Sequence, residues 1–277
     1  MRIPIGNSGT NAILQGAFGC YRDNEAAIQA LKSEKLELVR HYDVPGMESA
    51  AAIFCCGPSG AKLLASYFDG HDDVLMLPMF TSSSVYPFFE EYKHLSVWEK
   101  RIAYPAYSDT KWLDTKFFVG DYSIAAPDYY AAIEALFAVY GGESPAWLGA
   151  RRRFFQFLHV AYAAAIPRSR GSSRPLMIFA PHIMDDALAR QFIQDFPSGR
   201  FIHTIRDPIS VFDSCFDWVT HLQTCVAAGN RPDLAVWYLW PAFCTVEQIL
   251  NGDRAHFGME ARTGPSALRK CIGPRRQ

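Results

Sequence analysis

The segment from Phe54 to Leu64 combines the residue types that bind phosphate or sulfate groups in proteins. It reads FCCGPSGAKLL, so an apolar run ends at a turn with two glycines and a helix-forming run follows. Glycine lets the backbone turn tightly, and the start of a helix offers unpaired N–H groups at the positive end of its dipole. The sequence therefore predicts an anion-binding loop with these contact residues: Gly57, Pro58, Ser59, Gly60, Ala61, Lys62 and Leu63.

Two side chains of this loop could do chemistry. The Ser59 hydroxyl can donate a hydrogen bond to an anion, and Lys62 supplies a cation that can follow charge as it develops. The alternative is an ordinary turn between a strand and a helix, with a solvated lysine. Leu63 also departs from the nucleoside-triphosphatase pattern, in which Ser or Thr follows the lysine.

A second candidate anion site follows the apolar run from Phe201 to Ile205. Arg206 comes directly after this run, and an arginine at the end of a strand can hold a phosphate through two parallel hydrogen bonds. Ser214 lies eight residues further along, about two turns of the helix expected from Pro208 onward. An ion pair between Arg206 and Asp207, with Ser214 merely filling the helix, is the open alternative.

Strands that alternate with helices must position these residues. Short apolar runs bounded by glycine and proline predict strands, and periodic runs predict helices, which together favour an α/β fold with a central parallel sheet between layers of helices. Ligands in such folds bind beyond the carboxyl ends of the strands. The expected strands are Ala50–Cys56, Val74–Leu77, Pro175–Ala180 and Arg200–Ile205. Helices are expected at Asn24–Leu36, Lys62–Phe68 and Asp185–Phe196, and the first of these is expected to be exposed and amphipathic.

The stretch from about 79 to 170 is rich in aromatic residues and is predicted to be a mostly helical insertion in a single domain that spans residues 1–277. Its clearest helices are Tyr129–Tyr140 and Trp147–Ile166, with breaks at Pro105 and Pro127. Such a block often forms a cap or an acceptor pocket. The aromatic content does not identify the acceptor, because aromatic side chains suit both stacking and an ordinary core.

Composition limits the classes of partner. With 27 basic and 28 acidic residues the net charge is -1, so broad electrostatic binding to nucleic acid or an anionic membrane is not expected. The seven cysteines lack metal-ligand spacing and predict reduced thiols in a cytoplasmic protein. The first residues do not resemble a signal peptide, and the longest apolar stretch, Phe154–Ile166, is too short to span a membrane.

Together the two anion-binding segments resemble the sulfotransferase family that uses 3′-phosphoadenosine 5′-phosphosulfate. The resemblance covers Ile53–Pro78 and Leu176–Trp218, including an Asp-Phe-Pro run at Asp195 that is similar to bacterial members. Pro58 stands where many relatives have a basic residue, and Lys62 could supply that charge. Near the end of the chain, Arg269-Lys270-Cys271 matches only two residues of the family's Arg-Lys-Gly motif.

This resemblance implies a P-loop-like fold, 3′-phosphoadenosine 5′-phosphosulfate as the donor and no metal. The loop with Lys62 would hold the 5′ phosphosulfate, and Arg206 with Ser214 would hold the 3′ phosphate. His182 matches the family's general base, which would take a proton from a hydroxyl or amine of a small-molecule or carbohydrate acceptor. His182 could instead cap the helix that begins near Asp185, and other members use a glutamate, for which Glu90, near Glu91 and His94, is a candidate.

Two other functions are also compatible with the sequence. A nucleotide kinase or related phosphotransferase would need Mg²⁺ and a carboxylate pair, for which Asp72-Asp73 and Asp185-Asp186 are candidates. A catalytically inactive nucleotide-binding module would keep the loop and lack turnover. The sequence predicts neither the acceptor nor the oligomeric state.

Overall fold

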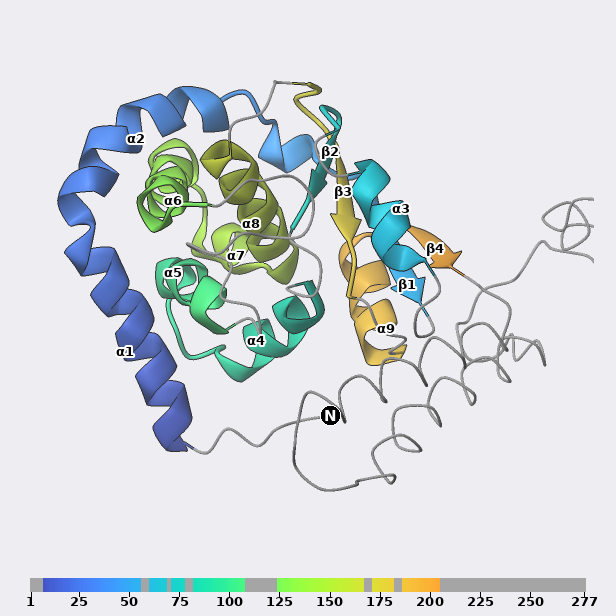
Figure 1. Cartoon of the computed structure of the whole chain (residues 1–277), viewed down its shortest axis with the longest axis horizontal. Helices are drawn as coiled ribbons and strands as arrows, with labels where there is room; N and C mark the ends of the chain where they lie inside the picture. Colours follow the sequence, from blue (N-terminus) through green and yellow to red (C-terminus); the bar gives the residue numbers. More distant parts are fainter. Residues whose placement is uncertain are drawn as a thin grey trace, which may run out of the picture. The chain divides into compact units, whose positions relative to one another are not determined.

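The computed structural model of the chain describes residues 7–55, 60–68, 71–77, 82–107, 124–166, 171–181 and 186–204 (Figure 1). Within these ranges the side chains of residues 7–13, Cys55, Lys62, Ser82 and Asp186 are not described. The described part is mixed α/β, with a small sheet beside a block of helices.

The sheet is parallel, as the alternation of strands and helices predicts. Its strands are β1 (Ala50–Cys55), β2 (Val74–Met76), β3 (Leu176–Phe179) and β4 (Arg200–Thr204), arranged in the order β2-β3-β1-β4. In the register, Ala51 pairs with Ile178 of β3 on one side and with Arg200 of β4 on the other. All four observed strands fall within the ranges expected from the apolar runs, and β1 lies at the centre.

Helices cover both faces of this sheet, so the expected layered arrangement is confirmed. On one face, α3 (Ala61–Phe68) packs Ala61 and Ala65 against a cluster that includes Ile53 and Ile178. On the other face lie α8 (Arg151–Ala165) and α9 (Asp186–Asp195). There Phe192 of α9 stacks on Phe179 of β3 with ring centroids 5.6 Å apart. Successive strand residues therefore point alternately toward α3 and toward α9.

The described residues between β2 and β3 are mostly helical, as expected. The block contains a short 3₁₀ turn, η2 (Ser82–Ser84), followed by α4 (Val85–Glu91), α5 (Val97–Tyr107), α6 (Ala126–Tyr140), α7 (Pro145–Gly149) and α8. The single helix predicted over Trp147–Ile166 is two helices, because Ala150 is extended (φ -63, ψ 137) between them. Pro127 lies in the first turn of α6, where a missing N–H costs little. Pro105, predicted as a break, lies inside α5.

Two N-terminal helices lie along this block, α1 (Asn7–Asp23) and α2 (Glu25–Val39) (Figure 1). The sequence predicts α2 as an exposed amphipathic helix, and most of its residues are indeed exposed, while its buried residues lie on the side that packs on α6. Lys35 on that face is buried, and its ammonium lies 2.7 Å from the Asp128 carboxylate of α6. The ion pair satisfies the buried charge. None of the described helices is both long and apolar enough to cross a membrane.

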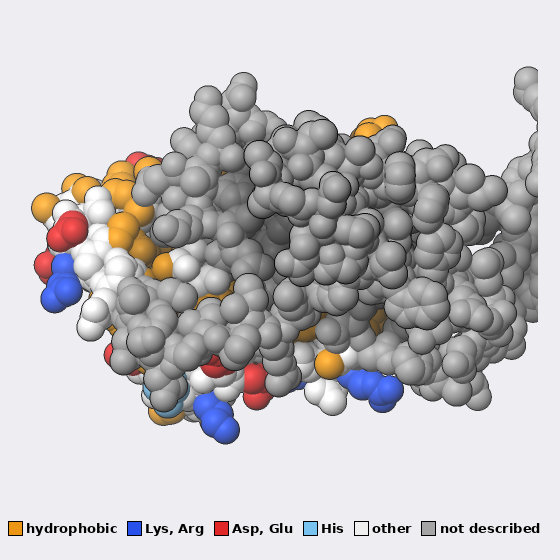
Figure 2. All heavy atoms as spheres, turned by 60° about the horizontal axis from the view of Figure 1, so that its bottom comes forward, with side chains coloured by type: hydrophobic (Ala, Val, Ile, Leu, Met, Phe, Trp, Pro, Cys, Tyr) orange, Lys and Arg blue, Asp and Glu red, His pale blue; other side chains and the backbone are white. Residues whose placement is uncertain are grey.

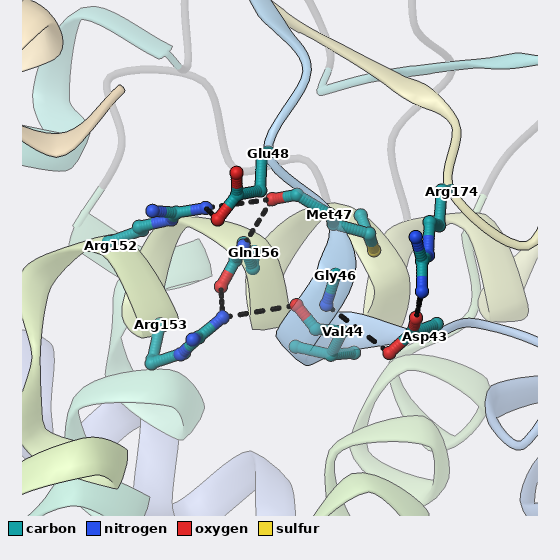
Figure 3. A network of polar contacts seen from close by, with 9 residues as sticks. All are labelled: Asp43, Val44, Gly46, Met47, Glu48, Arg152, Arg153, Gln156 and Arg174. Atoms are coloured by element: carbon teal, nitrogen blue, oxygen red, sulfur yellow. Dashed lines mark hydrogen bonds and ion pairs between the residues drawn. The ribbon is translucent and has the colours of Figure 1, made fainter. Parts of the chain in front are cut away.

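A polar clamp, defined here as Gln156 with Arg152 and Arg153 of α8, holds the chain that leads into β1 (Figure 3). The buried Gln156 amide donates to the Met47 carbonyl at 2.6 Å and accepts from Arg153 at 2.6 Å. Arg153 also donates to the carbonyl of Val44, at 3.0 Å, in the 3₁₀ turn η1 (Val44–Gly46). Arg152 completes the clamp through an ion pair with Glu48, at 3.2 Å. The clamp thus fixes the amino end of the central strand.

Candidate functional site

The carboxyl ends of β1 and β4 lie side by side at one edge of the sheet. Cys55 pairs with Thr204, so the two strands end in the same register position. β3 flanks β1 on its other side and ends at Phe179, which pairs with Ala52. The predicted loop leaves β1 at this edge, the segment with Arg206 leaves β4, and the segment with His182 follows β3. The topology therefore joins all three candidate segments to one edge.

The helices that follow β1 and β3 lie on opposite faces of the sheet. The connection after β1 contains α3 and that after β3 contains α9, and these helices cover different faces. Where neighbouring parallel strands lead to opposite faces, their loops diverge and leave a crevice, which is where α/β proteins usually bind ligands. Here the strands followed by helices on opposite faces are β1 and β3.

The helix α3 begins at Ala61, one residue before the start that the sequence predicts. The Leu64 N–H donates to the Gly60 carbonyl at 3.0 Å, so Gly60 caps the helix and the N–H groups of the next three residues have no partner within it. Gly60 has a φ of 91, a left-handed conformation that residues with a Cβ rarely adopt. A helix therefore starts within the segment that the sequence predicts to bind an anion.

The remaining predicted contacts divide between described and undescribed residues. Ala61 is buried against the sheet, whereas the Leu63 side chain is 61% exposed. Lys62 lies in the first turn of α3, but its side chain is not described. The other predicted site residues lie outside the described residues: Gly57, Pro58, Ser59, His182, Arg206 and Ser214.

A layer of aromatic rings lies under this edge on the α9 face. Phe54 of β1 is buried, and its ring centroid lies 5.7 Å from that of Phe201 and 6.3 Å from that of Phe179. Phe192 of α9 contacts Phe201 in turn, at 5.7 Å. Because closely packed rings leave little room for rearrangement, this layer gives the ends of β1 and β4 a rigid support.

His203, a residue of β4, belongs to the same layer. It pairs with Phe54 in the register, and the two rings are stacked with centroids 6.1 Å apart. Burial lowers the pKa of its imidazole, so the ring is neutral near pH 7. The signal that could have found it is its position, one residue before the end of a strand that leads to Arg206.

The carboxylates that the sequence offers as an alternative general base or as metal ligands make contacts within the fold. Glu90 on α4 pairs with Arg151 at 3.3 Å, and Glu91 accepts a hydrogen bond from Tyr107 at 2.9 Å. Asp73 precedes β2, at the opposite edge of the sheet from the candidate site, and accepts from the Ser172 N–H at 2.7 Å. Across the described ranges, no cluster of three or more His, Cys, Asp and Glu side chains could hold a metal ion.

The face shown in Figure 2 carries both basic and acidic side chains among its described residues. That distribution agrees with the net charge of -1. An anionic ligand would therefore depend on local groups such as those at the carboxyl edge.

In a comparison with known proteins, no family model, curated protein or solved structure matches the chain.

Proposed function

We propose that the protein is a sulfotransferase that transfers a sulfuryl group from 3′-phosphoadenosine 5′-phosphosulfate to a hydroxyl or amine of an acceptor. One observation carries the proposal: Cys55 and Thr204 end neighbouring strands in register, so the two anion-binding segments leave the sheet together. A nucleotide with phosphates at both its 3′ and 5′ positions needs two such sites close to one another. The helix start at Gly60 supports the 5′ site.

Each segment then has a role in donor binding. The loop from Gly57 to Leu63 holds the 5′ phosphosulfate through backbone N–H groups at the start of α3, the Ser59 hydroxyl and the Lys62 ammonium. Arg206 holds the 3′ phosphate through two parallel hydrogen bonds, helped by Ser214. The donor lies across the carboxyl ends of β1 and β4, and no metal is needed to bind it.

Sulfuryl transfer, like phosphoryl transfer, has a loose in-line transition state with charge on the outer and leaving oxygens. Positioning and cations therefore supply most of the rate acceleration. Lys62 stabilises the charge that builds on the leaving phosphate, and His182 accepts the proton that the acceptor loses as its oxygen or nitrogen bonds to sulfur. The acceptor is a small molecule or a carbohydrate that reaches this edge from the side of the helical block.

Calorimetric titration of the full chain tests the proposal. We expect 3′-phosphoadenosine 5′-phosphate, the product of the donor, to bind without Mg²⁺ and with higher affinity than ATP or GTP. Tighter binding of ATP or GTP that requires Mg²⁺ would support a kinase and refute the proposal. Binding of the bisphosphate without turnover across a broad panel of hydroxyl and amine acceptors would identify an inactive nucleotide-binding module instead.

A further inference from the structure

A buried arginine in the helical block, Arg101 of α5, lacks an acidic partner. The residue is 1% exposed, and no described carboxylate forms an ion pair with it. Its Nη1 donates to the Val97 carbonyl at 2.6 Å and its Nη2 to the Leu148 carbonyl at 3.1 Å. Its Nε has no hydrogen-bond partner in the part of the chain that the structure describes. Burial lowers the pKa of Arg101 to about 9, so the guanidinium is still charged near pH 7 and its charge is not balanced by a carboxylate.

The unused donor belongs to the edge of the guanidinium that binds carboxylates. Nε and Nη2 carry two parallel N–H groups, which match the two oxygens of a carboxylate. Arg151 uses this edge in the same fold, since its Nε donates to Oδ2 of Asp195 at 2.9 Å and its Nη2 to Oδ1 at 3.1 Å. In Arg101 the same edge has one carbonyl, that of Leu148, and one N–H without an acceptor. A carboxylate would supply both oxygens and the missing negative charge.

Aromatic rings form the surroundings of this guanidinium. Its Cζ lies 4.5 Å from the ring centroid of Phe157, 5.5 Å from that of Phe137 and 5.7 Å from that of Phe154. The ring faces stabilise the cation but accept no strong hydrogen bond from it. A singly charged carboxylate with an apolar body suits these surroundings better than a phosphate, whose higher charge costs more to remove from water.

The α7 flap, defined here as residues 141–150, lies against this edge of Arg101. Leu148 is buried in it, whereas most of the other residues of the flap are exposed. Apart from the bond between Arg101 and Leu148, its described hydrogen bonds reach residues no more than four positions away in the sequence. The Trp147 ring also packs on Phe157, with centroids 6.3 Å apart. Segments with exposed backbone and few distant contacts open at a lower cost than the core.

We propose that the α7 flap opens to admit a small organic carboxylate with an apolar body, whose two oxygens bind Nε and Nη2 of Arg101. One oxygen replaces the Leu148 carbonyl, and the other accepts from the N–H that has no partner. The apolar body of the ligand packs on Phe157 in place of Trp147. Because opening costs free energy, the affinity is lower than these contacts alone would give. The site lies within the helical block and does not rest on the proposed function.

Calorimetric titration of the full chain with benzoate and with its neutral amide, benzamide, tests the inference. We expect benzoate to bind at least tenfold more tightly than benzamide. Arg101→Met should abolish benzoate binding and should still fold, because an apolar side chain of similar volume often replaces a buried charge without loss of stability. Arg40→Met removes a positive charge from an exposed position on α2 and is the matched control, which should keep the wild-type affinity.

Several results would overturn the inference: no benzoate binding by the wild type, equal affinity for benzoate and benzamide, unchanged binding in Arg101→Met, or tighter binding of inorganic phosphate than of benzoate. If Arg101→Met does not fold, hydrogen exchange of the wild type replaces it. Faster exchange of the backbone N–H groups of the α7 flap when benzoate is added, with no change on adding benzamide, supports the opening. Unchanged exchange in the flap overturns it. Neither result bears on nucleotide binding, so the proposed function is tested separately.

Discussion

Lowering the pH should destabilise the fold through His159, a buried histidine of α8. Its ring is fully buried beside Phe155, with Nδ1 2.8 Å from the Phe155 carbonyl oxygen and Nε2 3.2 Å from that of Ile178 in β3. Burial lowers the pKa of the imidazole to about 4, although both carbonyl contacts act in the opposite direction. A neutral ring has one N–H and can donate to one of the two carbonyls only.

The sign and size of the effect follow from this pKa. In the unfolded chain the pKa of histidine is near its ordinary value of 6.5, so the unfolded state takes up a proton first as the pH falls. The contribution of His159 to stability is therefore present above pH 6.5 and is lost progressively toward pH 4. Between pH 7 and pH 5 the loss is about 2 kcal/mol.

Urea unfolding at pH 7, 6 and 5 measures this loss. We expect the unfolding free energy of the wild type to fall by about 2 kcal/mol more than that of His159→Gln over this range, since the variant lacks the titrating group. His94→Gln, the same substitution at an exposed histidine, is the matched control. Equal pH dependence in the wild type and His159→Gln would refute the reasoning. A smaller fall in the wild type would mean that the ring is charged and donates to both carbonyls.

Three further predictions concern the clamp and the candidate site. Gln156→Leu should lower the unfolding free energy in urea by about 1–3 kcal/mol, because the Met47 carbonyl loses the 2.6 Å bond from the amide, and a smaller change would show that the clamp is dispensable. Gly60→Ala should cost about 1–2 kcal/mol and weaken binding of the adenosine bisphosphate, because its φ of 91 disfavours a Cβ. Gly142→Ala, in open space without a left-handed φ, is its control, and equal losses in both would contradict the argument. His182→Ala should abolish sulfuryl transfer while leaving bisphosphate affinity nearly intact, and unchanged turnover would remove this histidine from the mechanism.

Local patterns account for much of the sheet. The apolar runs at Ala50 and Arg200 are bounded by glycine, proline or charged residues, and such short-range signals predict strands without reference to the rest of the chain. The start of α3 follows in the same way from Gly60. Alternation of strands with helices then gives a parallel sheet and places the candidate segments at its carboxyl edge.

Features that depend on distant partners were not predictable in this way. The sequence gives no clear pattern for α1, which is held by contacts such as the edge-to-face pair of Tyr21 and Trp98, at 5.0 Å. The burial of Lys35 depends on its ion pair with Asp128, which lies far along the chain. The pairing of Cys55 with Thr204 depends on strand order, and the support of His203 by Phe54 depends on register. Neither property is encoded within a single segment.

The central claim is that the segment after β4 binds the 3′ phosphate of an adenine nucleotide whose 5′ phosphate lies at the start of α3. Calorimetric affinities of the wild type and Arg206→Ala for 3′-phosphoadenosine 5′-phosphate and for adenosine 5′-monophosphate test it most directly. The claim predicts that the wild type prefers the bisphosphate by at least tenfold and that Arg206→Ala loses most of this preference while its affinity for the monophosphate hardly changes. Equal affinity of the wild type for the two nucleotides, or an unchanged preference in Arg206→Ala, would contradict it.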